Sequence, residues 1–276
     1  MGGGHWRLGI DIQPAQLVAV ALSARRDGIQ LRGWWRLPLT VDPDRDGLSP
    51  SLPATLTTLR ARLPRRLSVR AAFPAERAIR DMLPGSTLPL TPWQRHRLLL
   101  AQGERQLMLP AHQLACDFAP APEGGGRWQV CAVHRAQRDR WCALFDSAGL
   151  PLQRLTLAPC ALRRLARLAG ESPAAPLIYG DGYRFCWIAP WGSPLQYGFV
   201  SLSDGPEAAC AQAVAALPPG VADGVAPLHC GSDSGHRGWS GLRAVRHLVS
   251  PLPADPAAFC LALGLAVMPE SPLWMT

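Results

Sequence analysis

The sequence of 276 residues contains no lysine, so arginine supplies all 28 basic residues behind its net charge of +8. These arginines are scattered, and no run of five or more occurs. A protein surface that binds nucleic acid concentrates its basic residues. The scatter therefore favours arginine as an ordinary solvated charge, and we expect no direct contact with nucleic acid.

Close cysteine groups and long apolar runs are also missing. The eight cysteines lie far apart without a C-x-x-C pair, and most have apolar neighbours, as in RFCWIA. This distribution is typical of buried residues in a reducing compartment, and no metal site is expected, although His229, Cys230 and His236 come closest to a zinc ligand group. The longest apolar runs have about half of the residues that cross a bilayer, and no segment has the order of a signal peptide. We expect a cytoplasmic protein without a transmembrane segment.

The composition, 48% hydrophobic and 17% charged, predicts a globular α/β protein with a substantial core. Three strands are expected near residues 7–12, 17–23 and 29–37, because QPAQ and RRDG between them have turn chemistry. A helix is expected after Ser49, and the strand LSVRAAF ends at Pro74.

The middle of the chain predicts helices with clear ends. The segment TPWQ resembles a capping box and predicts a helix from Thr91 to about Met108. The segment WQVCAVH is typical of a strand. Two amphipathic helices follow, one ending at Gly149 and one beginning at Pro159, with the strand PLQRLTL between them.

The opening pattern then recurs. Residues 176–200 predict three strands, with turns at Asp181-Gly182 and at PWGS, followed by a helix near residues 206–216 and the strand APLHCGS. A final amphipathic helix is expected over residues 255–267. A meander, a helix and a further strand thus occur twice, which indicates a duplicated mixed sheet and a fold of two lobes.

An aspartate lies at the first turn of each repeat, Asp11 and Asp181. Two such turns facing one another suit a nucleotide, because their backbone N–H groups can bind phosphate and their carboxylates can hold hydrated Mg²⁺. The alternative is a purely structural role, in which both aspartates cap turns or pair with an arginine. A nuclease of the RNase H type would need more carboxylates beside Asp11 than the chain has there, and a Ser–His–Asp protease would need its members on separate elements, unlike LHCGSDSGH.

The motifs LGIDIQ, WWRLPL, AFPAERAI, DSAGLPLQRLTLAPCAL and LALGLA resemble those of PilM-type actin-like proteins of type IV pilus assembly, most closely the shorter HofM (DNA-utilization) branch. The resemblance implies an actin/Hsp70-like, RNase H-like duplicated fold with the extra subdomain of PilM and FtsA and a reduced second upper subdomain. The implied parts are a first lobe over residues 1–76, the extra subdomain over 77–155, a connecting helix over 156–172, a reduced second lobe over 173–255 and a returning C-terminal helix over 256–276.

The resemblance also implies a nucleotide site that has degenerated. Gln13 replaces the glycine of the first phosphate hairpin, and the chain has no lysine to contact the phosphates. We expect no catalytic residue and no cofactor; ATP with Mg²⁺ held by Asp11 and Asp181 is the alternative, in an ATPase or an ATP-gated switch. The implied vestigial nucleotide residues are Asp11, Gln13, Asp181, Gly182, Gly231, Ser232 and Gly264.

The implied role is that of a non-catalytic adaptor, held at the inner membrane by the cytoplasmic N-terminal tail of a PilN- or HofN-like membrane protein. An extended tail commonly docks by main-chain pairing, with apolar pockets at alternate positions. In strict strand alternation, Trp34 and Trp35 point to opposite faces. The sequence leaves the oligomeric state open. The expected groove residues are Trp34, Trp35, Leu37, Phe73, Arg77 and Ile79.

Overall fold

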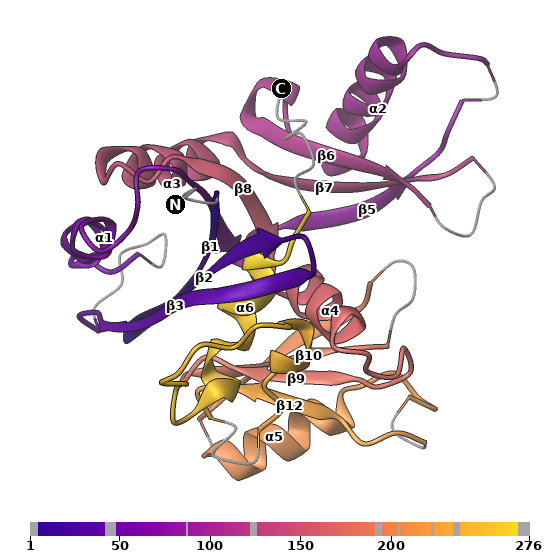
Figure 1. The fold of residues 1–276 in the computed structure, drawn as a ribbon. Coiled ribbons are helices and arrows are strands. Elements are labelled where there is room, and N and C mark those ends of the chain that lie inside the picture. Colours follow the sequence, from indigo (N-terminus) through magenta and orange to yellow (C-terminus); the bar gives the residue numbers. More distant parts are fainter. Residues whose placement is uncertain are drawn as a thin grey trace. The chain divides into compact units, whose positions relative to one another are not determined.

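The computed structural model forms two compact units (Figure 1). Unit 1 comprises residues 1–73 and 144–270, and unit 2 comprises residues 74–143. Within the described residues, no helix combines the length and apolar character that spanning a membrane would require. The residues described are 5–41, 48–86, 88–121, 126–190, 195–203, 205–221, 224–233 and 238–269.

The first lobe of unit 1 is built on a five-stranded sheet of order β3-β2-β1-β4-β8. The first three strands form the predicted antiparallel meander, and β4 and β8 run parallel to β1. Helix α1 (Leu52–Arg60) lies between β3 and β4 in the chain and buries three leucines. The strands are β1 (Trp6–Gln13), β2 (Gln16–Arg25), β3 (Gly28–Pro38), β4 (Leu67–Phe73) and β8 (Leu152–Leu157).

The second lobe, also in unit 1, repeats this order in a four-stranded sheet, β11-β10-β9-β12. Strand β12 pairs parallel to β9, as β4 does to β1, so the predicted duplication is confirmed. Helix α5 (Pro206–Ala215) packs on this sheet through Ala209 and Ala213. The described residues supply no counterpart of β8 in this sheet. Its strands are β9 (Leu177–Gly180), β10 (Arg184–Ile188), β11 (Tyr197–Ser201) and β12 (Leu228–Gly231).

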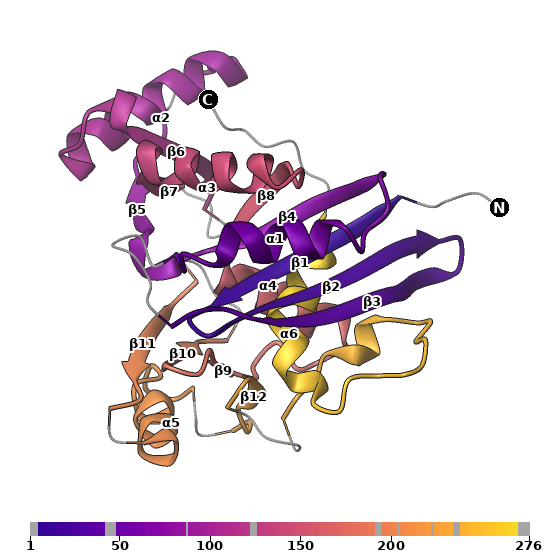
Figure 2. The ribbon, with the colours of Figure 1, turned by 90° about the vertical axis from the view of Figure 1, so that its left-hand side faces the viewer.

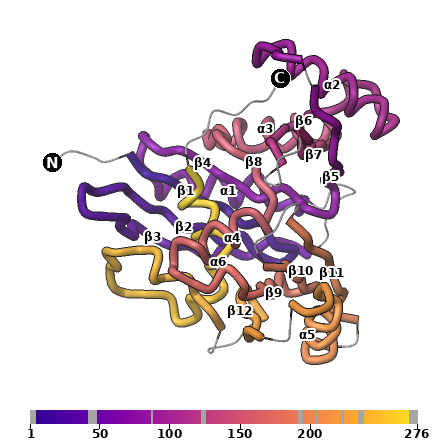
Figure 3. The backbone as a smooth tube through the Cα atoms, turned by 90° about the vertical axis from the view of Figure 1, so that its right-hand side faces the viewer, coloured from indigo at the N-terminus to yellow at the C-terminus, as the bar shows by residue number. Residues whose placement is uncertain are grey.

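Helices α4 (Ala158–Leu168) and α6 (Cys260–Ala266) lie between the two sheets (Figures 1 and 3). A Cβ on Gly9 of β1 would lie 2.0 Å from a carbonyl oxygen of α6, and one on Gly264 would lie 2.7 Å from the carbonyl oxygen of Ala161 in α4. Glycine therefore lets strand and helices approach closely. One apolar core continues from β2 and β3 through these helices to β9 and β10, so the lobes share a core.

Unit 2 is a three-stranded antiparallel sheet of order β5-β7-β6 with one helix, α2, on its apolar face. The predicted capping box is present, because the Thr91 hydroxyl accepts from the Gln94 N–H while the Gln94 side chain accepts from the Thr91 N–H. Strands β5 and β6 were not anticipated, because each is short and interrupted by polar residues. The elements are β5 (Ile79–Leu83), α2 (Pro92–Leu107), β6 (Leu114–Pro120) and β7 (Trp128–His134), and the following α3 (Arg135–Ser147) passes into unit 1 at Leu144.

The compact unit that overlaps the expected extra subdomain, residues 77–155, comprises residues 74–143. Residues from Leu144 onward belong to unit 1, since β8 pairs with β4 and Leu150 is fully buried. The unit also begins at Pro74, slightly before the expected residue 77. The boundary depends on the pairing of β4 with β8, two strands that are far apart in the chain.

Candidate functional site

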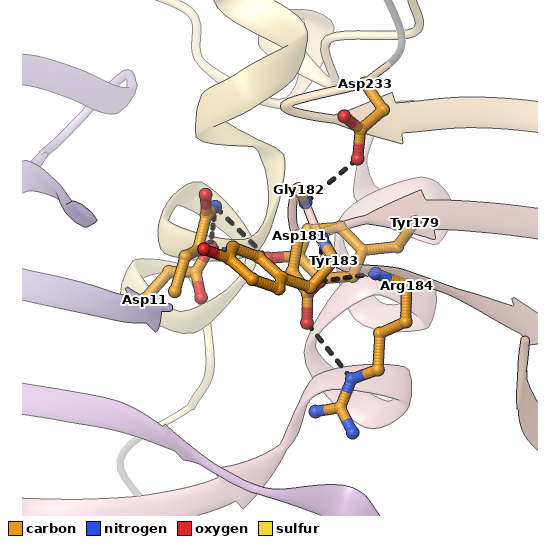
Figure 4. A network of polar contacts seen from close by, with 8 residues as sticks. Asp11, Tyr179, Asp181, Gly182, Tyr183, Arg184 and Asp233 are labelled. Atoms are coloured by element: carbon orange, nitrogen blue, oxygen red, sulfur yellow. Dashed lines mark hydrogen bonds and ion pairs between the residues drawn. The ribbon is translucent and has the colours of Figure 1, made fainter. Parts of the chain in front are cut away.

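The carboxylate of Asp11, near the end of β1, is bound by two side chains. Its Oδ2 accepts hydrogen bonds from Gln13 Nε2 and from the Tyr179 hydroxyl, both at 2.7 Å. Tyr179 lies on β9 of the second lobe, and Figure 4 shows the two side chains directed toward one another. Only 3% of Asp11 is exposed. The bonds therefore join the lobes at the position where the sequence analysis places a metal-and-phosphate carboxylate.

Gln13 is the centre of what we call the interlobe cluster: Asp11, Gln13, Gln16, Tyr179 and Ser232. Its Nε2 also donates to the Tyr179 hydroxyl oxygen at 3.3 Å. Its Oε1 accepts from Gln16 Nε2 and from the Ser232 hydroxyl, both at 2.7 Å, and Gln16 also contacts Ser232 at 2.8 Å. The Gln13 carboxamide is thus satisfied on both ends inside the protein. It occupies the hairpin position where a glycine would leave room for a ligand.

The second aspartate turn is also occupied by its own chain. Asp181 accepts from the N–H groups of Tyr183 and Arg184 at 3.0 Å and forms an ion pair with the Arg184 side chain at 3.1 Å. The N–H of Gly182 donates to the Asp233 carboxylate at 2.9 Å (Figure 4). Asp181 thus caps its turn and pairs with an arginine, which is the purely structural role named as the alternative to metal binding. The glycine N–H that could bind phosphate already binds an anion of the protein.

The remaining glycines of the predicted nucleotide site have packing roles. Gly231 has φ +99°, and a Cβ there would lie 2.0 Å from the carbonyl oxygen of Gly180, so glycine permits the close pairing of β12 and β9. Ser232 follows directly, and its N–H donates to the same carbonyl at 2.9 Å. Gly264 makes the contact between α6 and α4 and has no bond in the interlobe cluster.

Burial controls the charge of the cluster. It raises the pKa of Asp11 from 3.8 to about 6, against the opposing effect of the bonds from Gln13 and Tyr179; the nearby Asp181 raises it further. Burial also raises the pKa of Asp233, and the hydrogen bond from the Gly182 N–H partly offsets this rise. The pKa of the Tyr179 hydroxyl lies well above its ordinary value, so this group stays a hydrogen-bond donor.

The balance of charges at the two turns disfavours a triphosphate. Asp11, Asp181 and Asp233 supply three carboxylates, and Arg184, the cation seen there, is paired with Asp181. A metal between Asp11 and Asp181 would have to replace the donors that both carboxylates now have. The described part of the chain contains no group of three or more His, Cys, Asp or Glu side chains arranged to hold a metal ion. Cys210 and His229 lie 3.5 Å apart as a pair, and His236 is outside the described residues.

Sequence reasoning missed three residues of this region. Tyr179 stands in an apolar strand segment and Gln16 in a turn, so neither indicates a polar network. Asp233 lies in the loop GSDSG next to the predicted Gly231 and Ser232. The one available signal was Gln13, which stands where the resemblance implies a glycine in the first hairpin.

The expected partner groove draws residues from both units, and it remains a prediction. Trp34 packs edge-to-face on Phe259, with ring centroids 5.4 Å apart, and donates to the carbonyl of Pro251. It therefore belongs to the core of unit 1. Phe73 is 3% exposed, while the Trp35 ring lies over Gly33 on the opposite face of β3. The remaining expected groove residues are Leu37 at a half-buried position of β3 and, in unit 2, Arg77 and Ile79.

Two sheets of matching order, a shared core and an aspartate hairpin in each lobe define the actin-like ATPase fold. Over 95% of its length the chain superposes on 97% of a chain of the PilM–PilN type IV pilus biogenesis complex, with a TM-score of 0.69 and 18% identity. It is similar in sequence to the DNA utilization protein HofM of Escherichia coli (strain K12), with 27% identity over 267 residues, 95% of this chain and 96% of HofM. The resemblance that the motifs indicated is thus confirmed. No family model matches the chain.

Proposed function

We propose that this protein is a non-catalytic adaptor of a type IV pilus or DNA-uptake assembly at the inner membrane. Its partner is the cytoplasmic N-terminal tail of a PilN- or HofN-like membrane protein. The similarity to HofM and to a chain of the PilM–PilN complex supports a place in this assembly and a PilN-like partner. The interlobe cluster supports the absence of catalysis.

The single observation that carries the non-catalytic role is the side chain of Gln13. Of its four hydrogen bonds, those with Tyr179 and Ser232 join the first hairpin to the second lobe, where a nucleotide would have to lie, and those with Asp11 and Gln16 fix it within the hairpin. A ligand must break these bonds and desolvate three nearby carboxylates. It would also lack a charge-assisted contact from lysine, worth about 1.5–3 kcal/mol, or roughly 10- to 150-fold in affinity.

Nucleotide binding is tested by equilibrium titration of the full chain with labelled ATP and Mg²⁺. We expect no saturable binding in the micromolar range, and the same flat titration for Asp11→Ala. Micromolar affinity that disappears in Asp11→Ala would instead establish the alternative, an ATPase or an ATP-gated switch in the same machinery.

Partner binding is tested separately, with a synthetic peptide of the membrane protein's N-terminal tail. We expect saturable binding measured by fluorescence polarisation, none with a scrambled peptide, and weaker binding by Ile79→Asp. Binding that is absent at high micromolar peptide would overturn the adaptor role. The matched control is Ala101→Asp, an exposed position of α2.

A further inference from the structure

The segment of residues 245–252, which we call the strap, covers the outer edge of β3. Strand β3 is the edge strand of its sheet. The His247 N–H donates to the Ile29 carbonyl at 3.0 Å, and the Leu31 N–H donates to the His247 carbonyl at 2.9 Å. Further along, Trp34 Nε1 donates to the Pro251 carbonyl at 3.0 Å. The strap therefore runs parallel to β3, beside the hairpin of β2 and β3 (Figure 2).

The strap is also attached to the tip of this hairpin. Arg246 Nη1 donates to the Asp27 carbonyl at 2.8 Å, and His247 Nε2 lies 2.9 Å from the Asp27 carboxylate. A Cβ on Gly28 would lie 2.9 Å from the Arg246 side chain, so the two segments are in close contact. Strap and tip thus form one continuous surface of unit 1.

This surface exposes apolar side chains that the fold does not use. Leu248, Val249 and Leu252 are 43%, 47% and 39% exposed. They lie within five consecutive residues, whereas single exposed apolar residues are ordinary. The edge of β3 is already paired here, so strand addition does not account for them.

The same surface is strongly basic. Residues 24–28 and 242–252 contain four arginines and one aspartate, Asp27. This aspartate lies 2.9 Å from His247 Nε2, and the arginines outnumber it four to one. Arg25 and Arg26 are exposed at the hairpin tip, Arg243 is exposed just before the strap, and Arg246 is exposed within it.

We propose that strap and hairpin tip dock on an anionic lipid bilayer. Apolar side chains enter the boundary between headgroups and acyl chains, while arginines remain at the level of the phosphates. The occupant follows from charge complementarity, because clustered arginines next to an exposed apolar segment match the negative surface of an anionic bilayer. The contact is direct and does not require the partner tail of the proposed function.

The test is co-sedimentation of the full chain with vesicles of phosphatidylglycerol and phosphatidylethanolamine, with phosphatidylcholine vesicles for comparison. We expect binding to the anionic vesicles only, decreasing with salt because the arginine contribution is screened. The double variant Arg25→Gln/Arg26→Gln should weaken partition about thirtyfold. The triple variant Leu248→Ser/Val249→Ser/Leu252→Ser should weaken it about tenfold or more.

The matched control for charge is Arg65→Gln/Arg66→Gln, an exposed arginine pair in the same unit. The control for apolar exposure is Leu88→Ser/Met108→Ser in unit 2. Both controls should bind vesicles like the unchanged protein, and circular dichroism should show all variants folded.

Three results would overturn the proposal. They are no sedimentation with anionic vesicles, equal losses in the Arg65/Arg66 control, or strap variants that keep vesicle binding and lose binding of the partner-tail peptide instead. The vesicles contain no partner, so vesicle binding and peptide binding succeed or fail independently.

Discussion

The substitution Asp11→Asn should stabilise the protein at neutral and alkaline pH. Asparagine is nearly isosteric, and its Oδ1 can accept the bonds from Gln13 and Tyr179 that the carboxylate accepts now. It removes the charge that burial disfavours. If the carboxylate has no ligand to hold, nothing offsets this gain.

The magnitude follows from the pKa of Asp11. Burial raises this pKa from 3.8 to about 6, so the folded protein binds more protons than the unfolded chain between these values. Stability therefore falls as the pH rises through this window. The ionised carboxylate costs about 3 kcal/mol above pH 6 relative to its protonated form. Asparagine should recover up to about that amount at pH 8 and almost nothing below the ordinary pKa of 3.8.

The assay is guanidinium unfolding of the unchanged protein and of Asp11→Asn at several values between pH 4 and pH 8. The difference in the free energy of unfolding should grow with pH and level off above the folded-state pKa. In thermal unfolding at pH 8, the variant should melt roughly 5–10 °C higher. The exposed Asp146→Asn serves as control and should change stability by less than about 0.5 kcal/mol throughout.

Two outcomes would refute this reasoning. Asp11→Asn could be less stable than the unchanged protein at pH 8, which would mean that the charge makes a favourable contact. The difference could also be the same at every pH, which would mean that Asp11 titrates near its ordinary value.

Other substitutions test the packing and the caps. Gly9→Ala places a Cβ 2.0 Å from a carbonyl of α6 and should cost about 3 kcal/mol or prevent folding, as judged by soluble yield and thermal melting, whereas Gly103→Ala in α2, with open space around it, should gain about 0.5–1 kcal/mol. Thr91→Ala removes the capping hydroxyl and should cost about 1 kcal/mol in unfolding free energy; rescue by Thr91→Ser separates the cap from other effects. Tyr179→Phe removes a hydrogen-bond donor to buried Asp11 and should lower the free energy of unfolding by about 1–3 kcal/mol at pH 8 and by less at pH 4. A loss of stability that is the same at both pH values would contradict this assignment.

Most of the secondary structure could be predicted from local patterns. The meander at the start of the chain, the box at Thr91 and the helices ending at Gly149 and beginning at Pro159 depend on turn residues, caps and apolar spacing that are neighbours in sequence. The duplicated order followed from reading the same pattern twice. Strands β5 and β6 escaped because polar residues, Asp81 in β5 and Asp117 in β6, interrupt their apolar patterns.

The sequence by itself determined the class of fold, the resemblance to HofM, the absence of lysine and the presence of Gln13 in the first hairpin. The tertiary structure decided what fills that hairpin. Gln13 meets Tyr179 and Ser232 across 166 and 219 residues of chain, and such contacts leave no local signal. It also decided that residues 144–157 join the first lobe and that Trp34 packs inward, because strand pairing and burial act between segments that only folding brings together.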